Sequence, residues 1–247
     1  MEVHHHAHTS RKKWTHYFWE FLMLFLAVFC GFLAEYRLEH KIEKDRELQF
    51  IKSMISDLQE DEAMIKTNIA NYQSRISLMD SFLTYLINDS LVKSKGDDIY
   101  YMARVGPRIK PFVPNNKTFE QLKNSGSFRL IRKNETANRI MEYYNKFPLI
   151  LTLESIYFEE FSDYKSIAIK LFDPIVFRNM EMPDGNIMRN ANNPQLRPHN
   201  PELLKDFGVC IVYLNGTNRS LVPAQEDLLN AGSKLITFLR EKYRLKD

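Results

Sequence analysis

No glycine or proline occurs between Phe32 and Lys95, although these two residue types are the usual breaks between secondary-structure elements. The absence of both over this length predicts a long helix. Its apolar residues recur at steps of three and four, which is the spacing of a heptad seam on one helix face. The seam comprises Leu48, Ile51, Ile55, Leu58, Ile65, Ile69, Tyr72, Ile76, Met79, Leu83 and Leu86.

The seam is interrupted once, where Glu62 occupies a position expected to be apolar. A polar residue at such a position can set the register between helices or contact a partner. The seam must bury against another apolar surface. A second copy of the chain in a coiled coil is one possibility, and the later helices of the same chain are the other. We expect the second arrangement, a helical bundle.

The residues before this helix are apolar enough to cross a membrane. Phe21 to Ala34 is uncharged and almost wholly apolar, and with its flanks the segment 17–36 has about 20 residues, enough to span a bilayer as a helix. The bulky Phe32-Leu33 pair at its end disfavours signal-peptide cleavage. Basic and aromatic residues that favour the membrane surface flank it, namely Arg11, Lys12, Lys13, Trp14, Tyr17, Trp19 and Tyr36. We therefore predict a single-pass transmembrane helix.

Within the span, Ala27 and Gly31 are small residues four positions apart, which marks a possible helix-pairing face. The orientation of the span follows less directly from the sequence. The basic residues after the span outnumber the three before it, and this balance alone would place the C-terminal side inside. A long trailing domain can nevertheless cross the membrane largely regardless of charge. We expect the N-terminus inside.

The chain divides into a polar tail (1–16), the span (17–36), a long membrane-proximal helix (37–90) and a proline-containing connection (91–117). The connection contains Gly106, Pro107, Pro111 and Pro114, which favour extended backbone over helix. Residues 118–247 are predicted to complete the bundle and to include a long loop at 179–200, which is rich in asparagine and proline.

Several helices are predicted within 118–247. A short helix from Thr118 to Asn124 should end at Gly126, and another should begin at Asn134. Leu149 to Leu171 carries a wide apolar stripe. After the loop, Asn200-Pro201-Glu202 starts a helix that reaches about Leu214, although Val209 to Leu214 could instead be a strand. A terminal helix is predicted from about Pro223 to Arg244. The fold class is therefore mainly α.

Charge and motifs argue against several classes of function. The net charge of +3 is accounted for by the basic trio at residues 11–13, so the rest of the chain lacks a nucleic-acid footprint. The sequence contains no GxSxG, Walker, GxGxxG or CxxC motif, and its two cysteines, Cys30 and Cys210, lie far apart. We expect no catalytic residue, cofactor or metal.

Two groups of polar residues could suggest chemistry. His4, His5, His6 and His8 could bind a metal, but no structured partner ligand lies near them in the sequence. The acidic groups Glu60-Asp61-Glu62 and Glu159-Glu160 with Asp163 could serve as acid and base or as cation ligands. On helices such groups are typical of solvated faces, and that is what we expect here.

Two parts of the chain resemble a family of uncharacterised bacterial single-pass membrane proteins. One part comprises His6-Ala7-His8-Thr9, Arg11-Lys12-Lys13-Trp14, the run from Tyr17 to Tyr36, and Leu38-Glu39-His40. The other comprises Thr118-Phe119, Leu122, Ser125-Gly126, Leu130-Ile131 and Tyr143-Tyr144, which is similar to a Thr-Phe-x-x-Leu-x-x-Ser-Gly signature. The resemblance implies a bacterial membrane protein with a helical soluble region. It implies no activity, cofactor or catalytic residue.

These observations favour a non-enzymatic scaffold, interaction or sensor-like protein in the bacterial inner membrane, with the C-terminal domain in the periplasm. Its expected partners are the lipid bilayer and either another membrane protein or a second copy of the chain, and not nucleic acid. The alternative is a tethered ligand-binding or hydrolytic domain whose site is formed by the segments 104–114 and 179–200.

Overall fold

The structure is a computed structural model that describes residues 14–245. These residues are mainly helical and contain no strand, as the sequence predicts, and one isolated bridge joins Glu181 and Ile187. The helices are α1 (Trp14–Leu86), α2 (Asp89–Ser94), α3 (Gly96–Val105), α4 (Lys117–Asn124), the 3-10 helix η1 (Ser127–Leu130), α5 (Asn134–Tyr144), α6 (Phe147–Leu171), α7 (Pro174–Asn179) and α8 (Pro201–Tyr243). The chain divides into two compact units, and the boundary between them in the sequence lies between Phe50 and Ile51.

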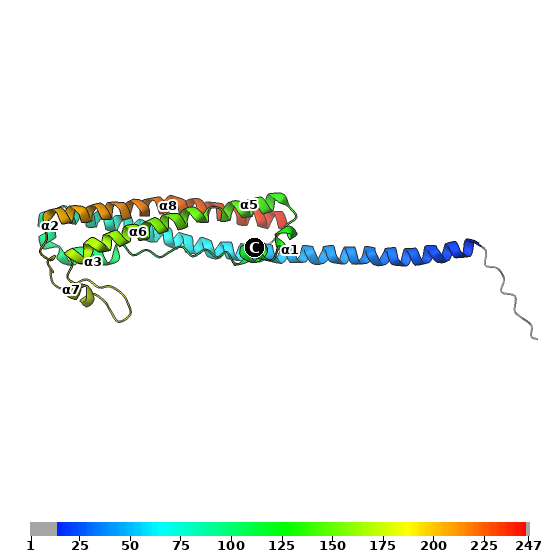
Figure 1. The fold of residues 1–247 in the computed structure, drawn as a ribbon, viewed down its shortest axis with the longest axis horizontal. Coiled ribbons are helices and arrows are strands. Elements are labelled where there is room, and N and C mark those ends of the chain that lie inside the picture. Colours follow the sequence, from blue (N-terminus) through cyan, green and yellow to red (C-terminus); the bar gives the residue numbers. More distant parts are fainter. Residues whose placement is uncertain (1–13, 246–247) are drawn as a thin grey trace, which may run out of the picture. The chain divides into compact units, whose positions relative to one another are not determined.

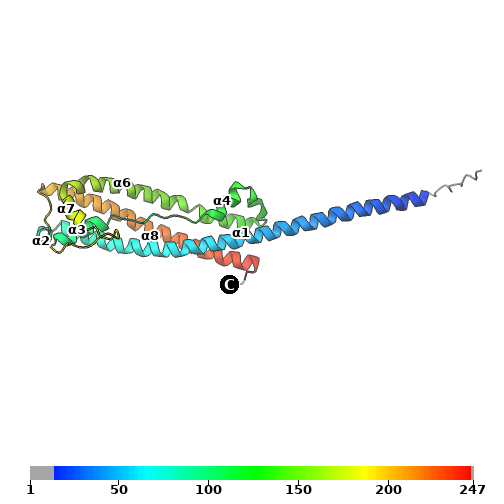
Figure 2. The same ribbon diagram turned by 90° about the horizontal axis from the view of Figure 1, so that it is seen from below.

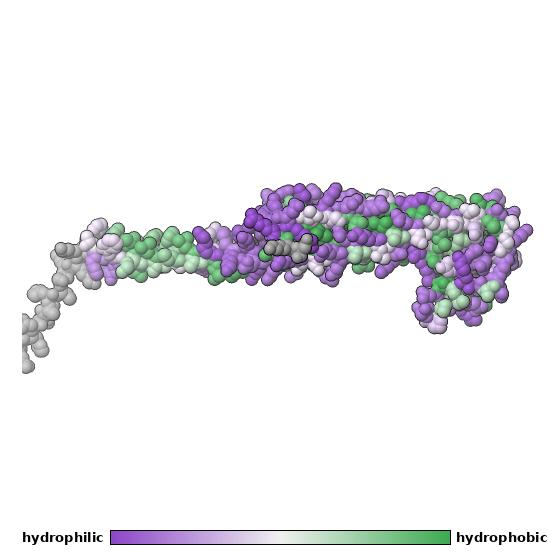
Figure 3. Space-filling model, turned by 180° about the vertical axis from the view of Figure 1, so that it is seen from behind, coloured by the Kyte–Doolittle hydropathy of each residue, from purple (hydrophilic) through white to green (hydrophobic). Residues whose placement is uncertain are grey.

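The first unit contains the N-terminal part of α1. Its large apolar side chains are exposed, and Figure 3 shows them as an apolar band on this helix. Phe21, Phe25 and Phe29 stack on one another at steps of four residues, with ring centroids 6.3 and 5.9 Å apart. Among residues 14–245, α1 is the one helix that is long and apolar enough to cross a membrane.

The second unit is a helical bundle in which the remainder of α1 lies beside α6 and α8 (Figure 1). Two contacts show that α1 and α8 are antiparallel, since Glu62 meets Ser233 whereas Asp80 meets Arg219. Helices α5 and α6 run parallel to α1, because the contact between Tyr143 of α5 and Asp61 is followed, at higher residue numbers on both sides, by the contact between Glu154 of α6 and Tyr72.

A fourth element of the bundle runs antiparallel to α1 and is only partly helical. It consists of α3, the extended residues 106–116 and α4, and we call residues 106–116 the connecting segment. Figure 2 shows this segment running along the bundle from α3 to α4. Three prolines, Pro107, Pro111 and Pro114, explain why the chain is extended here, since each lacks an N–H donor and disfavours helix in the residue before it.

Aromatic rings fill the core at the end of the bundle where α1 meets α2. Phe207 of α8 contacts Phe82, Tyr164 and Phe172, with ring centroids 5.9, 4.6 and 5.7 Å away. Tyr100 of α3 packs edge-on against Phe172 at 5.0 Å. Such edge-to-face pairs add to the stability that comes from burying the rings.

The loop that follows α7 packs on α3. Its Asn193 side chain accepts a hydrogen bond from the Gly96 N–H at 2.6 Å, and the Pro194 carbonyl lies where a side chain at Gly96 would begin. Tyr100 links the same loop to the end of α6, because its hydroxyl donates to Gln195 O and accepts from Asp173 N. A glycine at position 96 is what permits this close approach.

Two local predictions are corrected by the structure, and one open alternative, that for residues 209–214, is decided. The predicted connection 91–117 contains a helix, α3, because Ile99, Tyr100 and Met102 bury an apolar face that precedes the first proline. Val209 to Leu214 is helical rather than a strand. The two helices predicted after residue 200 are one helix, α8. It continues through Pro223 because its inner face contacts α1 on both sides of the proline, through Asn215 before it and Ser233 after it.

Candidate functional site

The predicted membrane-surface residues that the structure describes are exposed on α1. Trp14, Tyr17, Trp19 and Tyr36 are each more than half exposed, as membrane-surface side chains would be in the absence of lipid. Arg11, Lys12, Lys13 and the four N-terminal histidines lie outside the described residues. Ala27 and Gly31 are exposed, and a methyl group added at Gly31 would meet no atom within 4 Å.

The buried position in the middle of the seam is Asp61, not Glu62. The side chain of Glu62 is 20% exposed, where it accepts a hydrogen bond from the Ser233 hydroxyl and pairs with Lys66. Asp61 is 1% exposed. A step of three residues from Leu58 and a step of four to Ile65 place Asp61 on the apolar face, and this spacing in the sequence could have identified it. The prediction that the 60–62 carboxylates are all solvated is therefore wrong for Asp61.

Asp61 holds the connecting segment against α1. One carboxylate oxygen accepts the backbone N–H of Asn115 at 2.8 Å, and the other accepts the hydroxyl of Tyr143 at 2.9 Å. Burial raises the pKa of Asp61, and these two hydrogen bonds counteract part of that rise. The same carboxylate raises the pKa of Tyr143 beyond the increase that burial causes, so the tyrosine remains a neutral donor.

Glu154 of α6 repeats this arrangement further along the connecting segment. Its Oε1 accepts both the backbone N–H of Phe112 at 2.7 Å and the hydroxyl of Tyr72 at 3.2 Å. Burial raises the pKa of Glu154, and the two hydrogen bonds lower it in part. Glu154 lies within the predicted apolar stripe of 149–171, four residues after the buried Ile150 and three before the buried Tyr157, and this spacing could have identified it.

Two more side chains of α1 hold the ends of the same element. The carboxylate of Asp57 accepts the N–H of Thr118 at 3.0 Å, in the first turn of α4, where the preceding Asn116 makes no side-chain cap. Arg75 donates to the carbonyl of Val105 at 2.8 Å, at the end of α3. An extended chain cannot satisfy its own backbone groups, and these four side chains provide the partners that a helix would provide internally.

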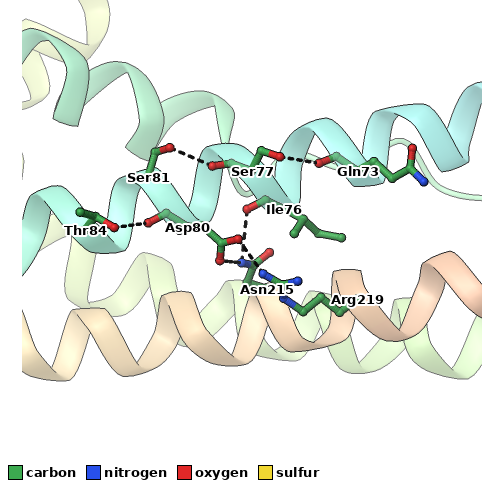
Figure 4. Close-up of polar contacts among 8 residues, drawn as sticks. All are labelled: Gln73, Ile76, Ser77, Asp80, Ser81, Thr84, Asn215 and Arg219. Carbon is green, nitrogen blue, oxygen red and sulfur yellow. Dashed lines mark hydrogen bonds and ion pairs between the residues drawn. The ribbon is translucent and has the colours of Figure 1, made fainter.

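A second polar group ties α1 to α8 (Figure 4). Asp80 accepts a hydrogen bond from the Asn215 amide at 2.7 Å and one from the Arg219 guanidinium at 2.6 Å. Ser77, Ser81 and Thr84 on the same helix donate to the carbonyl four residues earlier. The Asp80 group and the three hydroxyl groups therefore have a structural role, because their hydrogen bonds are formed within the bundle.

The two segments proposed as an alternative site, 104–114 and 179–200, meet where Arg104 pairs with Glu181. The Arg104 guanidinium also lies 5.9 Å from the centre of the Phe177 ring. Asn193 and Gln195 of the 179–200 loop contact α3 instead, through Gly96 and Tyr100. The structure therefore joins the two segments at one ion pair.

Surface grooves lie elsewhere on the bundle. One of about 710 Å³ is lined by Glu135 and Arg139 of α5 and by Ser233, Lys234, Thr237, Phe238, Glu241 and Lys242 of α8. Another of about 430 Å³ lies between α1 and α3 and is lined by Asn71, Ser74, Arg75, Ser77, Leu78, Ser81, Tyr101 and Val105. The first has mixed charge, whereas no carboxylate lines the second.

The described part of the chain contains no group of three or more histidine, cysteine or acidic side chains placed to hold a metal ion. Cys30 and Cys210 are free thiols. No family model, curated protein or solved structure matches this chain.

Proposed function

We propose that this chain is a single-pass membrane protein whose helical bundle binds partner proteins and catalyses no reaction. The exposed apolar part of α1 is the observation that carries the proposal, since a stretch of this length and composition is stable in a bilayer and not in water. The flanking Trp14, Tyr17, Trp19 and Tyr36 support it.

The buried acidic groups support a role without catalysis. Asp57, Asp61 and Glu154 are buried carboxylates of the second unit, and each already accepts a backbone N–H of the connecting segment or of α4. A carboxylate that maintains the fold in this way is poorly placed to exchange protons with a substrate.

An exposed apolar group on α8 supports partner binding. Val209, Val212 and Tyr213 are each more than half exposed and lie within two turns of one helix. Scattered apolar residues are common on protein surfaces, but a contiguous group is typical of interaction sites. We infer that this face contacts another membrane protein or a second copy of the chain.

The kind of membrane and the orientation of the chain in it are inferred from the resemblance to bacterial single-pass proteins and from the length of the trailing domain. We place the protein in the bacterial inner membrane with its N-terminus in the cytoplasm and the bundle in the periplasm. A reporter enzyme that is active only in the periplasm, fused after the last residue of the chain, should be active. If a reporter that is active only in the cytoplasm is active at the same position, the orientation is the opposite of the one proposed.

Membrane fractionation of the full chain tests the anchor. Leu24→Arg with Val28→Arg places two charges in the span, each costing about 3 kcal/mol on insertion scales, and should release the protein from membranes. The matched control, Val209→Arg with Val212→Arg, adds the same charges to exposed sites on α8 and should stay in the membrane. Extraction of the unmodified protein by alkaline carbonate would contradict anchoring.

The same control variant tests partner binding. Affinity purification of the unmodified full chain from detergent-solubilised membranes should yield a stoichiometric partner or a homo-oligomer. The variant with two arginines on α8 should lose that partner while it stays in the membrane. A monomer recovered alone from both preparations would refute the proposed role.

A further inference from the structure

Three arginine side chains from three elements gather beside one carboxylate in the second unit. Arg75 comes from α1, Arg104 from α3 and Arg108 from the connecting segment, and Glu181 follows α7. Desolvation lowers the pKa of Arg108, and the positive charges of Arg104 and Arg75 lower it further, whereas Glu181 opposes the shift. The backbone N–H of Arg108 donates to the carbonyl of Val105 at 3.2 Å, the same carbonyl to which Arg75 donates, and the positive charges of Arg75 and Arg104 both act on Arg108.

The scaffold explains two of these arginines. Arg75 donates to the carbonyls of Val105 and Gly106, where the negative end of the α3 dipole attracts a cation. Arg104 pairs with Glu181 and joins the loop after α7 to α3. Arg108 is exposed and adds a third guanidinium group, whose positive charge is disfavoured by Arg104 and Arg75 and favoured by Glu181.

The groove of about 430 Å³ between α1 and α3 borders this cluster, since Arg75 and Val105 line it. Its other polar groups, on Asn71, Ser74 and Tyr101, can donate hydrogen bonds. The guanidinium of Arg189 lies 4.3 Å from the centre of the Tyr101 ring and forms an ion pair with Asp98, so it adds no unpaired charge to the groove. A positive cluster beside a polar groove without acidic lining fits an anionic molecule.

We propose that Arg75, Arg104 and Arg108 bind the oxyanion group of a small polar ligand. Guanidinium groups bind carboxylates and phosphates through paired, charge-assisted hydrogen bonds, which makes these two groups the expected chemistry. The rest of the ligand lies in the groove, against the hydroxyl and amide groups. This inference depends neither on membrane anchoring nor on the partner surface of α8, and it assigns no reaction to the site.

Arg108→Gln is the informative variant because Arg108 is exposed and its removal relieves repulsion. Arg219→Gln is the matched control, since this exposed arginine of α8 pairs with Asp80 outside the cluster. The full chain is reconstituted in nanodiscs of zwitterionic lipid and heated at constant ionic strength. Inorganic phosphate or succinate replaces chloride, and unfolding is followed by circular dichroism.

Phosphate or succinate should raise the melting temperature of the unmodified chain and of Arg219→Gln. For Arg108→Gln the concentration that gives half of the effect should increase about tenfold, as expected for the loss of one charge-assisted hydrogen-bonding group. In chloride, Arg108→Gln should melt at the same temperature as the unmodified chain or higher, which shows that it folds.

A parallel sample with phosphatidylglycerol in the nanodiscs separates two sources of the oxyanion. Stabilisation by the soluble anions in zwitterionic discs assigns a soluble ligand. Stabilisation that appears only with phosphatidylglycerol and is lost in Arg108→Gln assigns a lipid headgroup. The proposal is overturned if no anion stabilises the protein, or if Arg108→Gln responds as the unmodified chain does.

Discussion

At the scale of single residues, three buried carboxylates determine the path of the connecting segment. Asp57, Asp61 and Glu154 accept backbone N–H groups at Thr118, Asn115 and Phe112, three positions apart along the chain. Burying a charged group is costly unless it is hydrogen-bonded, and leaving a buried N–H unpaired costs about 1 to 3 kcal/mol. Each carboxylate and its N–H group therefore offset the cost of burying the other.

Replacement of Glu154 separates its charge from its hydrogen bonds. Glu154→Gln keeps the Oε1 that accepts from both Phe112 and Tyr72, and we expect a change of less than about 1 kcal/mol in the free energy of unfolding. Glu154→Met leaves both donors unpaired in the core and should cost about 2 kcal/mol or more. Urea unfolding in detergent, followed by circular dichroism, measures both. Equal losses in the two variants would show that charge matters more than the hydrogen bonds.

Gln225 of α8 presents the opposite case. It is fully buried, and neither atom of its amide group has a hydrogen-bond partner among the described residues. Gln225→Met, which has a similar volume, removes an unpaired amide and should raise the free energy of unfolding by about 1 kcal/mol. The same urea titration tests this expectation. A loss of stability instead would mean that the amide is satisfied in solution by water or a ligand.

At the scale of elements, the fourth element of the bundle is extended rather than helical over the connecting segment, between α3 and α4. Its prolines remove three N–H donors that a core would otherwise have to satisfy, and side chains of α1 and α6 serve the buried donors of Phe112 and Asn115. The connecting segment thus packs in the bundle without helical hydrogen bonds. Its stability depends on neighbours that are distant in sequence, so we expect it to open before the long helices do.

Pro223 tests how far tertiary packing supports an unfavourable residue. It is exposed within α8, where it lacks the N–H that would bond to the preceding turn. Pro223→Ala restores that hydrogen bond and should stabilise the protein by about 1 to 3 kcal/mol, reduced somewhat by the greater freedom of the unfolded chain. Thermal unfolding checks this, with Ser220→Ala on the same exposed face as a control that should have little effect.

At the scale of the whole molecule, the raised pKa values of Asp61 and Glu154 link stability to pH. Each folded-state pKa lies above the ordinary value near 4. At a pH between the unfolded-state and folded-state pKa of each group, the folded protein binds more protons than the unfolded chain. The stability that the two protonated groups contribute is therefore fully present below about pH 4 and is lost as the pH rises through their folded-state pKa values.

A double variant, Asp61→Asn with Glu154→Gln, removes this dependence and keeps the hydrogen bonds. Asn retains an oxygen for the Asn115 N–H and gains an amide that can donate to Tyr143. The double variant should therefore gain stability relative to the unmodified protein as the pH rises from about 4 to 7. Urea titrations at several pH values measure the difference. A constant difference across this range would contradict the raised pKa values.

The sequence by itself determined the elements that depend on neighbours along the chain. Spacing of apolar residues identified the mainly helical fold and most of the seam, and the apolar run with its aromatic flanks marked the stretch of α1 that is able to cross a membrane. The helix predicted from Thr118 to Asn124 is present as α4, and Gly126 adopts the left-handed conformation expected where such a helix ends. These features are local, so periodicity and residue type were sufficient.

Tertiary structure alone decided which polar residues matter. Glu154 meets Phe112 across 42 residues of sequence, and Asp61 meets Tyr143 across 82. No local pattern reveals such pairs, because they depend on which helix faces pack together. The same applies to the cluster of Arg75, Arg104 and Arg108, and to the continuation of α8 through Pro223. Local sequence sets the period of a helix, whereas the partner of a buried polar group is known only once the chain has folded around it.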